Sequence, residues 1–136
     1  MPSYTGSRID HLNISVPDLE RSLAFYRPVL TAIGIVEMLQ IPPDPSEPRA
    51  AMHGFGWPHK PFFWLIGDGR AGHNMHVAFT VDDRATVDLF YEIALAAGGT
   101  THLGPGVRPE YHADYYGAFV FDPDGINVEA VCHEAG

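Results

Sequence analysis

The sequence has little cysteine, no long apolar run and few basic residues, and each shortage excludes a class of protein. Only one cysteine, Cys132, is present, so no internal disulfide can form, as is typical of proteins kept in a reducing compartment. No apolar run approaches the roughly 20 residues of a membrane-spanning helix. Lysine and arginine number 8 against 17 aspartate and glutamate, which gives a net charge of −9. We therefore expect no nucleic acid and no membrane as a partner, because both attract basic surfaces.

The beginning of the chain also lacks an apolar stretch. Residues 1–12 read MPSYTGSRIDHL, without the hydrophobic segment of a signal peptide. A length of 136 residues is enough for one domain with a single core. We expect a cytoplasmic protein with a single domain over residues 1–136.

An internal repeat is the strongest signal in the sequence. Two segments align when the chain is shifted by 65 residues, the separation of His11 and His76. Residues 11–18 read HLNISVPD and residues 76–83 read HVAFTVDD, so both follow the pattern His-apolar-x-apolar-Ser/Thr-Val-x-Asp. The same offset aligns a Phe-Tyr pair, a leucine, an alanine and a glycine: Phe25-Tyr26 with Phe90-Tyr91, Leu30 with Leu95, Ala32 with Ala97, and Gly34 with Gly99. The pattern predicts two copies of one module, at about 8–67 and 73–133.

Each module is expected to begin with a strand, because apolar residues alternate with polar ones there. Asp18 and Asp83 are placed to cap helices over 18–33 and 83–97, which Gly34 and Gly99 would end in the left-handed conformation. Further strands are expected at 36–41, 50–55, 61–66, 100–103, 111–121 and 126–132, with irregular stretches at 42–48 and 104–109. The predicted fold class is α+β, with paired βαβββ modules whose mixed, mostly antiparallel sheets carry the helices on one face.

Strand parity places three potential metal ligands on the sheet faces opposite the helices. The apolar residues of each first strand pack on the helix, so His11 and His76 point the other way. The apolar residues of the last strand alternate with Glu129, which therefore shares that face. Taken singly, each side chain has an ordinary structural explanation, such as a hydrogen-bonded histidine. Taken together, they favour a divalent metal ion, Fe, Mn, Zn, Ni or Co, with coordination positions left open for a substrate.

These residues resemble the vicinal oxygen chelate superfamily, which includes glyoxalase I, bleomycin-resistance proteins and extradiol dioxygenases. The matching segments are 9–18, 19–34, 75–83 and the run DPDGINVE at 122–129. The resemblance implies paired βαβββ modules that curl around a cleft, with His11, His76 and Glu129 at the positions of three metal ligands. It also implies a homodimer, and leaves open whether the cleft forms within one chain or across two.

Departures from the family pattern bear on the reaction. By the repeat offset, Trp64 stands where glyoxalase I has its fourth ligand, and an indole can neither bind the metal nor shuttle a proton, so the glyoxalase I reaction is not expected. Extradiol dioxygenases also use a tyrosine, and Phe119 lies near that position. His112, Tyr115 and Tyr116 lie close by in the sequence and are candidate catalytic groups, as proton donors or bases. We expect one of the two tyrosines to face the cleft, and edge packing is the alternative for both.

Three further residues are candidates for binding the substrate. Arg108 lies in a Gly-Pro-rich stretch and could hold an anionic group, although a surface position is the alternative. Trp64 and Phe119 could form aromatic walls for a planar ligand. The other histidines have no support from the repeat and are interpreted as ordinary residues: His53, His59, His73, His102 and His133.

The favoured function is therefore a metal-dependent enzyme of lyase, isomerase or dioxygenase type. Its substrate would be a small molecule with adjacent oxygen atoms, because one metal ion can chelate and polarise both. The alternative is a metal-free protein of the bleomycin-resistance type that sequesters a ligand. A metal-binding structural module within a larger assembly is a third, weaker hypothesis.

Overall fold

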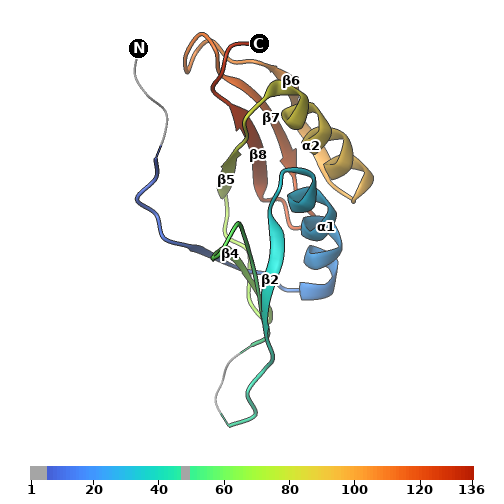
Figure 1. Ribbon diagram of the computed structural model, residues 1–136. Helices are drawn as coiled ribbons and strands as arrows, with labels where there is room; N and C mark the ends of the chain where they lie inside the picture. Colours follow the sequence, from blue (N-terminus) through green and yellow to red (C-terminus); the bar gives the residue numbers. More distant parts are fainter. Residues whose placement is uncertain (1–5, 47–49) are drawn as a thin grey trace.

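The computed structural model describes residues 6–46 and 50–136 (Figure 1). The first module contains β1 (Leu12–Ser15), α1 (Leu19–Ala32), β2 (Val36–Ile41), β3 (Met52–Gly56) and β4 (Pro61–Ile66). The second contains β5 (His76–Thr80), α2 (Arg84–Ala96), β6 (Thr100–Val107), β7 (Tyr116–Phe121) and β8 (Asn127–Cys132). Both modules thus have the βαβββ order that the sequence predicts. No helix within the described ranges is long and apolar enough to cross a membrane.

Each module forms one four-stranded sheet. The strand orders are β1-β4-β3-β2 and β5-β8-β7-β6. The first and last strands of each module pair in parallel, and the other neighbours pair antiparallel. The predicted α+β class with mixed, mostly antiparallel sheets is therefore confirmed. In this arrangement β1 and β5 are both edge strands.

The 65-residue offset holds for individual strand pairs. Leu12 pairs with Phe63 in the first sheet, and Val77 pairs with Val128 in the second. Gly54 of β3 likewise pairs with Trp64 of β4, and Phe119 of β7 pairs with Glu129 of β8. Trp64 and Glu129 thus stand at equivalent positions of the two modules.

The helices begin where the sequence predicts. The carboxylate of Asp18 accepts a hydrogen bond from the Arg21 amide at 3.1 Å, and that of Asp83 accepts one from the Thr86 amide at 2.7 Å. These contacts satisfy backbone donors of the first helical turn, which have no partner within the helix.

The end of α1 is also as predicted, whereas that of α2 is shifted by one residue. Gly34 adopts the left-handed conformation with φ +83°, but in the second module the left-handed residue is Gly98, with φ +105°, not Gly99. The amide of Gly99 instead donates to the Ala94 carbonyl at 2.8 Å and closes the helix end. The cause is that α2 stops at Ala96, one residue short of the repeat-related end of α1.

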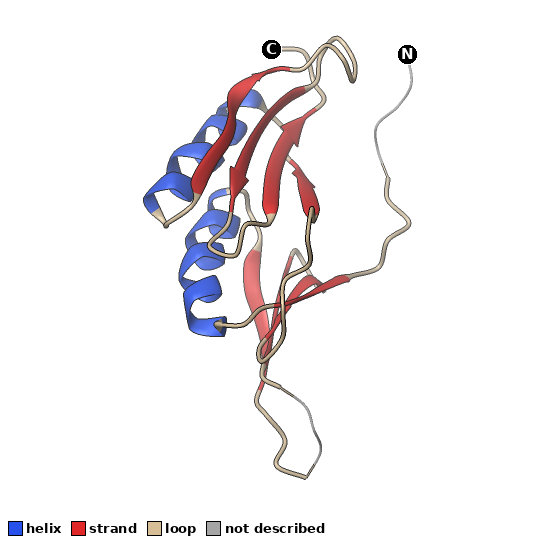
Figure 2. Ribbon diagram, turned by 180° about the vertical axis from the view of Figure 1, so that it is seen from behind, coloured by secondary structure: helices blue, strands red, loops and turns tan. Residues whose placement is uncertain are grey.

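Both helices lie on the same side of the two sheets (Figures 1 and 2). Helix α1 also contacts the second module, because the buried Tyr26 hydroxyl donates to Asp122 Oδ2, in the turn after β7, at 2.6 Å. The Phe63 and Phe79 rings meet between the modules, with centroids 5.4 Å apart. The buried apolar cluster therefore includes residues of both modules.

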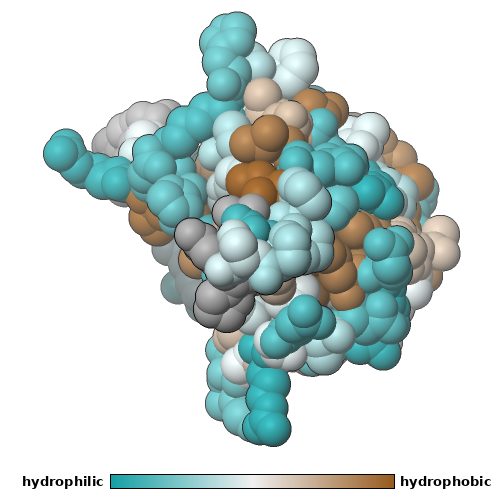
Figure 3. Space-filling model, turned by 90° about the horizontal axis from the view of Figure 1, so that it is seen from below, coloured by the Kyte–Doolittle hydropathy of each residue, from teal (hydrophilic) through white to brown (hydrophobic). Residues whose placement is uncertain are grey.

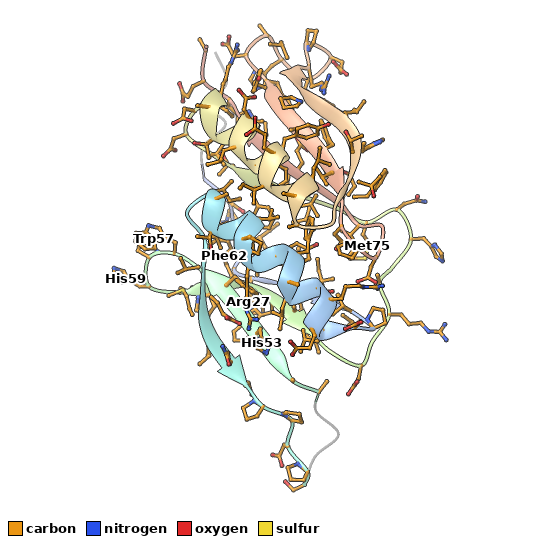
Figure 4. The ribbon with its side chains drawn as sticks, turned by 90° about the vertical axis from the view of Figure 1, so that its right-hand side faces the viewer. Arg27, His53, Trp57, His59, Phe62 and Met75 are labelled. Atoms are coloured by element: carbon orange, nitrogen blue, oxygen red, sulfur yellow. The ribbon has the colours of Figure 1, made fainter. Side chains whose placement is uncertain are left out.

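Charged side chains also tie α1 to its own sheet. The Arg27 guanidinium donates to both oxygens of Glu37, at 3.0 and 3.2 Å. The Nδ1 atom of His53 lies 2.5 Å from the same carboxylate. Arg27 and His53 accordingly lie near one another beneath the helix (Figure 4). His53 has the ordinary structural role that the sequence indicates.

The predicted strand bounds are wrong around residue 110. Strand β7 begins at Tyr116, not at 111, because residues 108–115 form a turn closed by the Arg108 amide and the Tyr115 carbonyl at 2.7 Å. Strand β6 extends to Val107 and so includes residues 104–107 of the irregular stretch predicted at 104–109, of which Gly106 and Val107 pair with β7. Strand β3 begins at Met52 rather than at residue 50. The other irregular stretch, at 42–48, reaches into residues that lie outside the described ranges.

Candidate functional site

The centre of the candidate site is a contact between His76 and Glu129. His76 begins β5 and Glu129 lies in β8, and the parallel pairing of these strands brings the two side chains together. Nε2 of His76 lies 2.8 Å from Oε1 of Glu129. The histidine side chain is 44% exposed, whereas that of the glutamate is 1% exposed. One accessible imidazole thus meets one buried carboxylate, as strand parity predicts.

Tyr115 binds the other oxygen of the carboxylate. Its hydroxyl donates a hydrogen bond to Glu129 Oε2. Burial raises the pKa of Glu129, although the hydrogen bonds from Tyr115 and His76 act in the opposite direction. Burial and the neighbouring carboxylate also raise the pKa of Tyr115, so the phenol keeps its proton at neutral pH. Each oxygen of Glu129 therefore has its own partner.

Arg108 lies over the site and not on the open surface. Its guanidinium stands 5.7 Å from the centroid of the Phe119 ring, and one of its terminal nitrogens donates to the Gly104 carbonyl. The positive charge of Arg108 acts against the rise in the pKa of both Glu129 and Tyr115. Its Nε atom is buried and has no hydrogen-bond partner among the described residues. A cation held against an aromatic ring beside a carboxylate is suited to binding an anionic group.

The sequence interpretation missed His102. Its ring lies 4.7 Å from that of Phe121 and 6.3 Å from that of Phe119, measured between centroids, so it belongs to the aromatic wall of the site. The His76 ring lies 5.8 Å from the same Phe119 ring. Strand alternation was the only signal that could have found His102. Register shifts on both sides of Leu103 interrupt that alternation in β6.

His112 and His133 form a pair behind Tyr115. Nε2 of His112 lies 2.9 Å from Nδ1 of His133. Their rings contact the Tyr115 ring, with centroids 5.6 and 5.4 Å from it. Burial and the nearby His112 lower the pKa of His133. His112 was expected to act as an acid or base in the site, but the structure places it against Tyr115 and His133. His133 was interpreted as ordinary, and nothing in the repeat indicates its position.

The two candidate tyrosines face different parts of the molecule. The Tyr116 hydroxyl donates to Asp88 of α2 at 2.6 Å, and the Arg84 guanidinium lies 5.0 Å from the centroid of its ring. Tyr116 is thus on the helix side, away from Glu129. Tyr115 reaches Glu129 from the turn that precedes β7, which is why parity alone could not assign it.

His11 does not join His76 and Glu129 within one chain. Its side chain is 51% exposed, and Nδ1 lies 2.7 Å from Asp10, which also binds Lys60. In the described part of the chain, no three His, Cys, Asp or Glu side chains are close enough to hold a metal ion. His11 and His76 do line one groove of about 670 Å³ beside β1 and β5.

The groove has a largely apolar and aromatic lining. Ile9, Trp57, Phe62 and Phe79 contribute to it. Trp57 projects from the hairpin between β3 and β4 (Figure 4) and is 63% exposed. Apolar patches are also visible at the end of the molecule shown in Figure 3. The groove is therefore a surface on which an apolar or aromatic partner could bind.

Trp64 packs on its neighbouring strand and does not line this groove. A Cβ atom added at Gly54 would lie 2.8 Å from the indole, so the ring fits only because residue 54 has no side chain. In the first module, indole and glycine thus occupy the positions that Glu129 and Phe119 occupy in the second. The first module supplies no carboxylate at this position, as the sequence indicates.

The donor atoms of the His76–Glu129 pair fit a metal ion. Two ligand atoms at right angles, each about 2.0–2.1 Å from an ion, lie about 2.9 Å apart. The imidazole and carboxylate atoms are 2.8 Å apart, which is also the length of the hydrogen bond between them. A neutral imidazole and a carboxylate suit Fe, Mn, Zn, Ni or Co. The pair can hold one edge of the coordination sphere, and further ligands must come from elsewhere.

Comparison with known proteins gives the family. Residues 8–130 match the family model described as the Glyoxalase/Bleomycin resistance protein/Dioxygenase superfamily. The chain belongs to this superfamily. No curated protein matches the chain significantly.

Solved structures of the same superfamily resemble the chain. A glyoxalase/bleomycin resistance protein from Albidiferax ferrireducens T118 is 27% identical, over 94% of this chain and 100% of that one, with a TM-score of 0.73. A family enzyme from Burkholderia phytofirmans PsJN is 21% identical, over 94% and 100% of the two chains, with a TM-score of 0.67. A glyoxalase I mutant from Zea mays is 24% identical over 90% of this chain, but only 46% of the maize chain is covered, with a TM-score of 0.69. At these identities the last two similarities support the fold alone.

Proposed function

We propose that this superfamily member is a metal-dependent enzyme of lyase, isomerase or dioxygenase type. Its substrate would be a small molecule with adjacent oxygen atoms. The observation that supports this most is the 2.8 Å approach of His76 Nε2 to Glu129 Oε1, with the carboxylate buried and the imidazole accessible. A buried carboxylate needs partners, and a divalent ion at this pair would supply positive charge.

The residues around the pair have separate tasks in this proposal. His76 and Glu129 hold the ion, which when bound would polarise two adjacent substrate oxygens. Arg108 binds an anionic part of the substrate and stabilises negative charge that develops on it. Phe119 provides an aromatic wall beneath the guanidinium. Tyr115 keeps its proton and holds the carboxylate in place.

We further propose that each chain is a single cytoplasmic domain and that two chains form the complete site as a homodimer. His11 is exposed and lies apart from the His76–Glu129 pair, so the third ligand would come from a second copy. The unpaired edges of β1 and β5 both border the groove. Ile9 in this groove is 76% exposed, and a second copy would cover it.

The glyoxalase I reaction is not part of the proposal. Trp64 replaces the carboxylate that the second module provides at the equivalent position, and an indole cannot accept the substrate proton. Dioxygenase chemistry, and lyase or isomerase chemistry other than that of glyoxalase I, remain in the proposal. The three-ligand set of His11, His76 and Glu129 leaves coordination sites for both substrate oxygens.

Activity measurements on metal-loaded protein test the proposal. Two reactions are measured for wild type and for His76→Ala, namely oxygen uptake with catechols and isomerisation of methylglyoxal–thiol adducts. Each is measured with Fe, Mn, Zn, Ni and Co ions in turn. We expect metal-dependent turnover in the oxygen-uptake assay, most of it lost in the variant, and none with the methylglyoxal–thiol adducts, because their isomerisation is the glyoxalase I reaction. Equal rates with and without metal, in a folded protein, would exclude the enzyme.

A metal-free protein that sequesters a ligand is the second candidate. The groove of about 670 Å³ is large enough for a small molecule, and its lining includes Trp57, Phe62 and Phe79. The net charge of −9 would favour a cationic planar ligand. Tight binding of aromatic cations by protein that retains no metal would favour this function over the enzyme.

A further inference from the structure

We propose that Tyr115 is a positioning residue for Glu129, whose phenol holds Oε2 and thereby directs Oε1 towards His76. This inference rests on the proposed function, because it assigns a role around the same metal pair. It also changes the expected role of Tyr115. A phenol that already donates to Glu129 does not have that proton free for a substrate oxygen.

Each of the two carboxylate oxygens of Glu129 contacts a different side chain. Oε1 faces His76 Nε2 at 2.8 Å, and Oε2 accepts the proton of the Tyr115 hydroxyl. The carboxylate is almost completely buried, so water cannot replace a lost partner at little cost. With Oε2 held, rotation of the carboxylate group would break the phenol hydrogen bond. The phenol therefore selects the orientation in which Oε1 is presented to the metal.

A glycine makes room for this contact. A Cβ atom at Gly117 would lie 2.9 Å from Glu129 Oε2 and 3.2 Å from Tyr115 Cε1. Any larger residue at 117 would therefore push against both members of the hydrogen bond. Gly117 has no positive φ that would require glycine, so the absence of a side chain matters here for space alone.

The Tyr115 ring is itself held on several sides. Tyr111, His112 and His133 surround it, with ring centroids 4.7, 5.6 and 5.4 Å away. The 2.9 Å contact between His112 and His133 ties the turn 108–115 to the end of β8. Glu129 also lies in β8. The turn that carries the phenol is therefore tied to the same strand that carries its acceptor. A donor fixed in this way loses little further entropy when the site orders around an ion.

Loss of the phenol should weaken metal binding without removing a ligand. Groups that orient a metal ligand typically contribute about 10–100-fold to metal affinity. Tyr115→Phe keeps the ring and its contacts but removes the hydroxyl. Tyr91→Phe is a matched control, because it removes a phenol that donates to Thr101 on the same module, at 2.7 Å.

Two measurements on wild type, Tyr115→Phe and Tyr91→Phe test the inference. The first is the dissociation constant for Co²⁺ and Mn²⁺, obtained by competition with a chelator. The second is the set of imidazole ¹⁵N signals of His76 in metal-free protein, assigned with His76→Gln. We expect Tyr115→Phe to raise the dissociation constant about 10–100-fold and to shift the His76 signals. Tyr91→Phe should change neither.

Each outcome decides the question. If wild type binds metal and Tyr115→Phe binds it equally well, Tyr115 does not position Glu129 and the inference is wrong. If wild type binds no metal but Tyr115→Phe shifts the His76 signals, the positioning role stands and the proposed metal-dependent function fails. If wild type binds no metal and the signals do not move, both are overturned.

Discussion

Trp64 and Glu129 occupy the same position in the two modules, and their surroundings differ accordingly. The indole of Trp64 lies against Gly54, whereas the carboxylate of Glu129 lies between His76 and Tyr115. The repeated backbone thus carries an apolar contact in one module and a buried charge in the other. The carboxylate of the candidate site and its two hydrogen-bond partners consequently all come from the second module.

Enlarging Gly54 should destabilise the first sheet. In Gly54→Ala the new methyl group would lie 2.8 Å from the Trp64 ring, and overpacking of this kind costs about 1–3 kcal/mol. Urea unfolding of Gly54→Ala, Trp64→Leu and the double variant measures the free energy of unfolding. Because the clash needs the indole, the loss from Gly54→Ala should be smaller in the Trp64→Leu background. Strictly additive losses would contradict this contact.

Ionisation of Glu129 should make the stability of metal-free protein depend on pH. Burial raises the pKa of Glu129 above the usual 4.5, so the folded state binds the proton more tightly than the unfolded state does. Ionisation therefore lowers the free energy of unfolding as the pH rises above 4.5. Glu129→Gln lacks this loss. Between pH 4 and pH 7 the free energy of unfolding of wild type should therefore fall relative to that of Glu129→Gln in chemical denaturation. A difference between the two proteins that does not change with pH would contradict the prediction.

Tyr26→Phe should loosen the contact between α1 and the second module. The substitution leaves the buried Asp122 without its phenol donor, although its other oxygen still accepts from the Asp124 and Ile126 amides at 2.8 and 2.9 Å. Leaving a buried acceptor unsatisfied costs about 1–3 kcal/mol. Urea unfolding should show this loss, with a clearly smaller one for Tyr91→Phe, whose hydrogen bond is exposed. Similar losses in both variants would argue against a special role of the Tyr26–Asp122 contact.

The His112–His133 pair should make the fold sensitive to mild acid. Burial and His112 lower the pKa of His133 below the usual 6.5, and Glu134 opposes this only in part. The unfolded state therefore binds more protons just below pH 6.5, so the free energy of unfolding falls as the pH is lowered. The Tyr115 ring also lies against the His133 ring. His133→Gln should show a smaller loss between pH 7 and pH 5 in urea unfolding. An unchanged pH dependence would exclude His133 as the cause.

Local sequence patterns predict part of the fold and part of the candidate site. The repeat and strand alternation predicted the modules and the shared face of His76 and Glu129. The caps at Asp18 and Asp83 were likewise predicted, because a side chain and an amide three residues on suffice to form each one.

The remainder of the site depends on contacts that no local pattern records. Tyr115 reaches Glu129 from a turn where an extended strand was expected, so period-two parity did not apply to it. The register shifts in β6 hid His102 in the same way. His112 and His133 are far apart in sequence, and their contact arises only when the turn folds onto the end of β8.

Metal content shows whether His76 and Glu129 hold a divalent ion. Wild type, His76→Ala and Glu129→Gln are loaded separately with Fe²⁺, Mn²⁺, Zn²⁺, Ni²⁺ and Co²⁺, desalted, and analysed for metal per chain, with circular dichroism to verify the fold. We expect wild type to retain one equivalent of at least one ion and both variants to lose it. Folded wild type that retains none of the five ions, or variants that retain as much as wild type, would contradict this expectation.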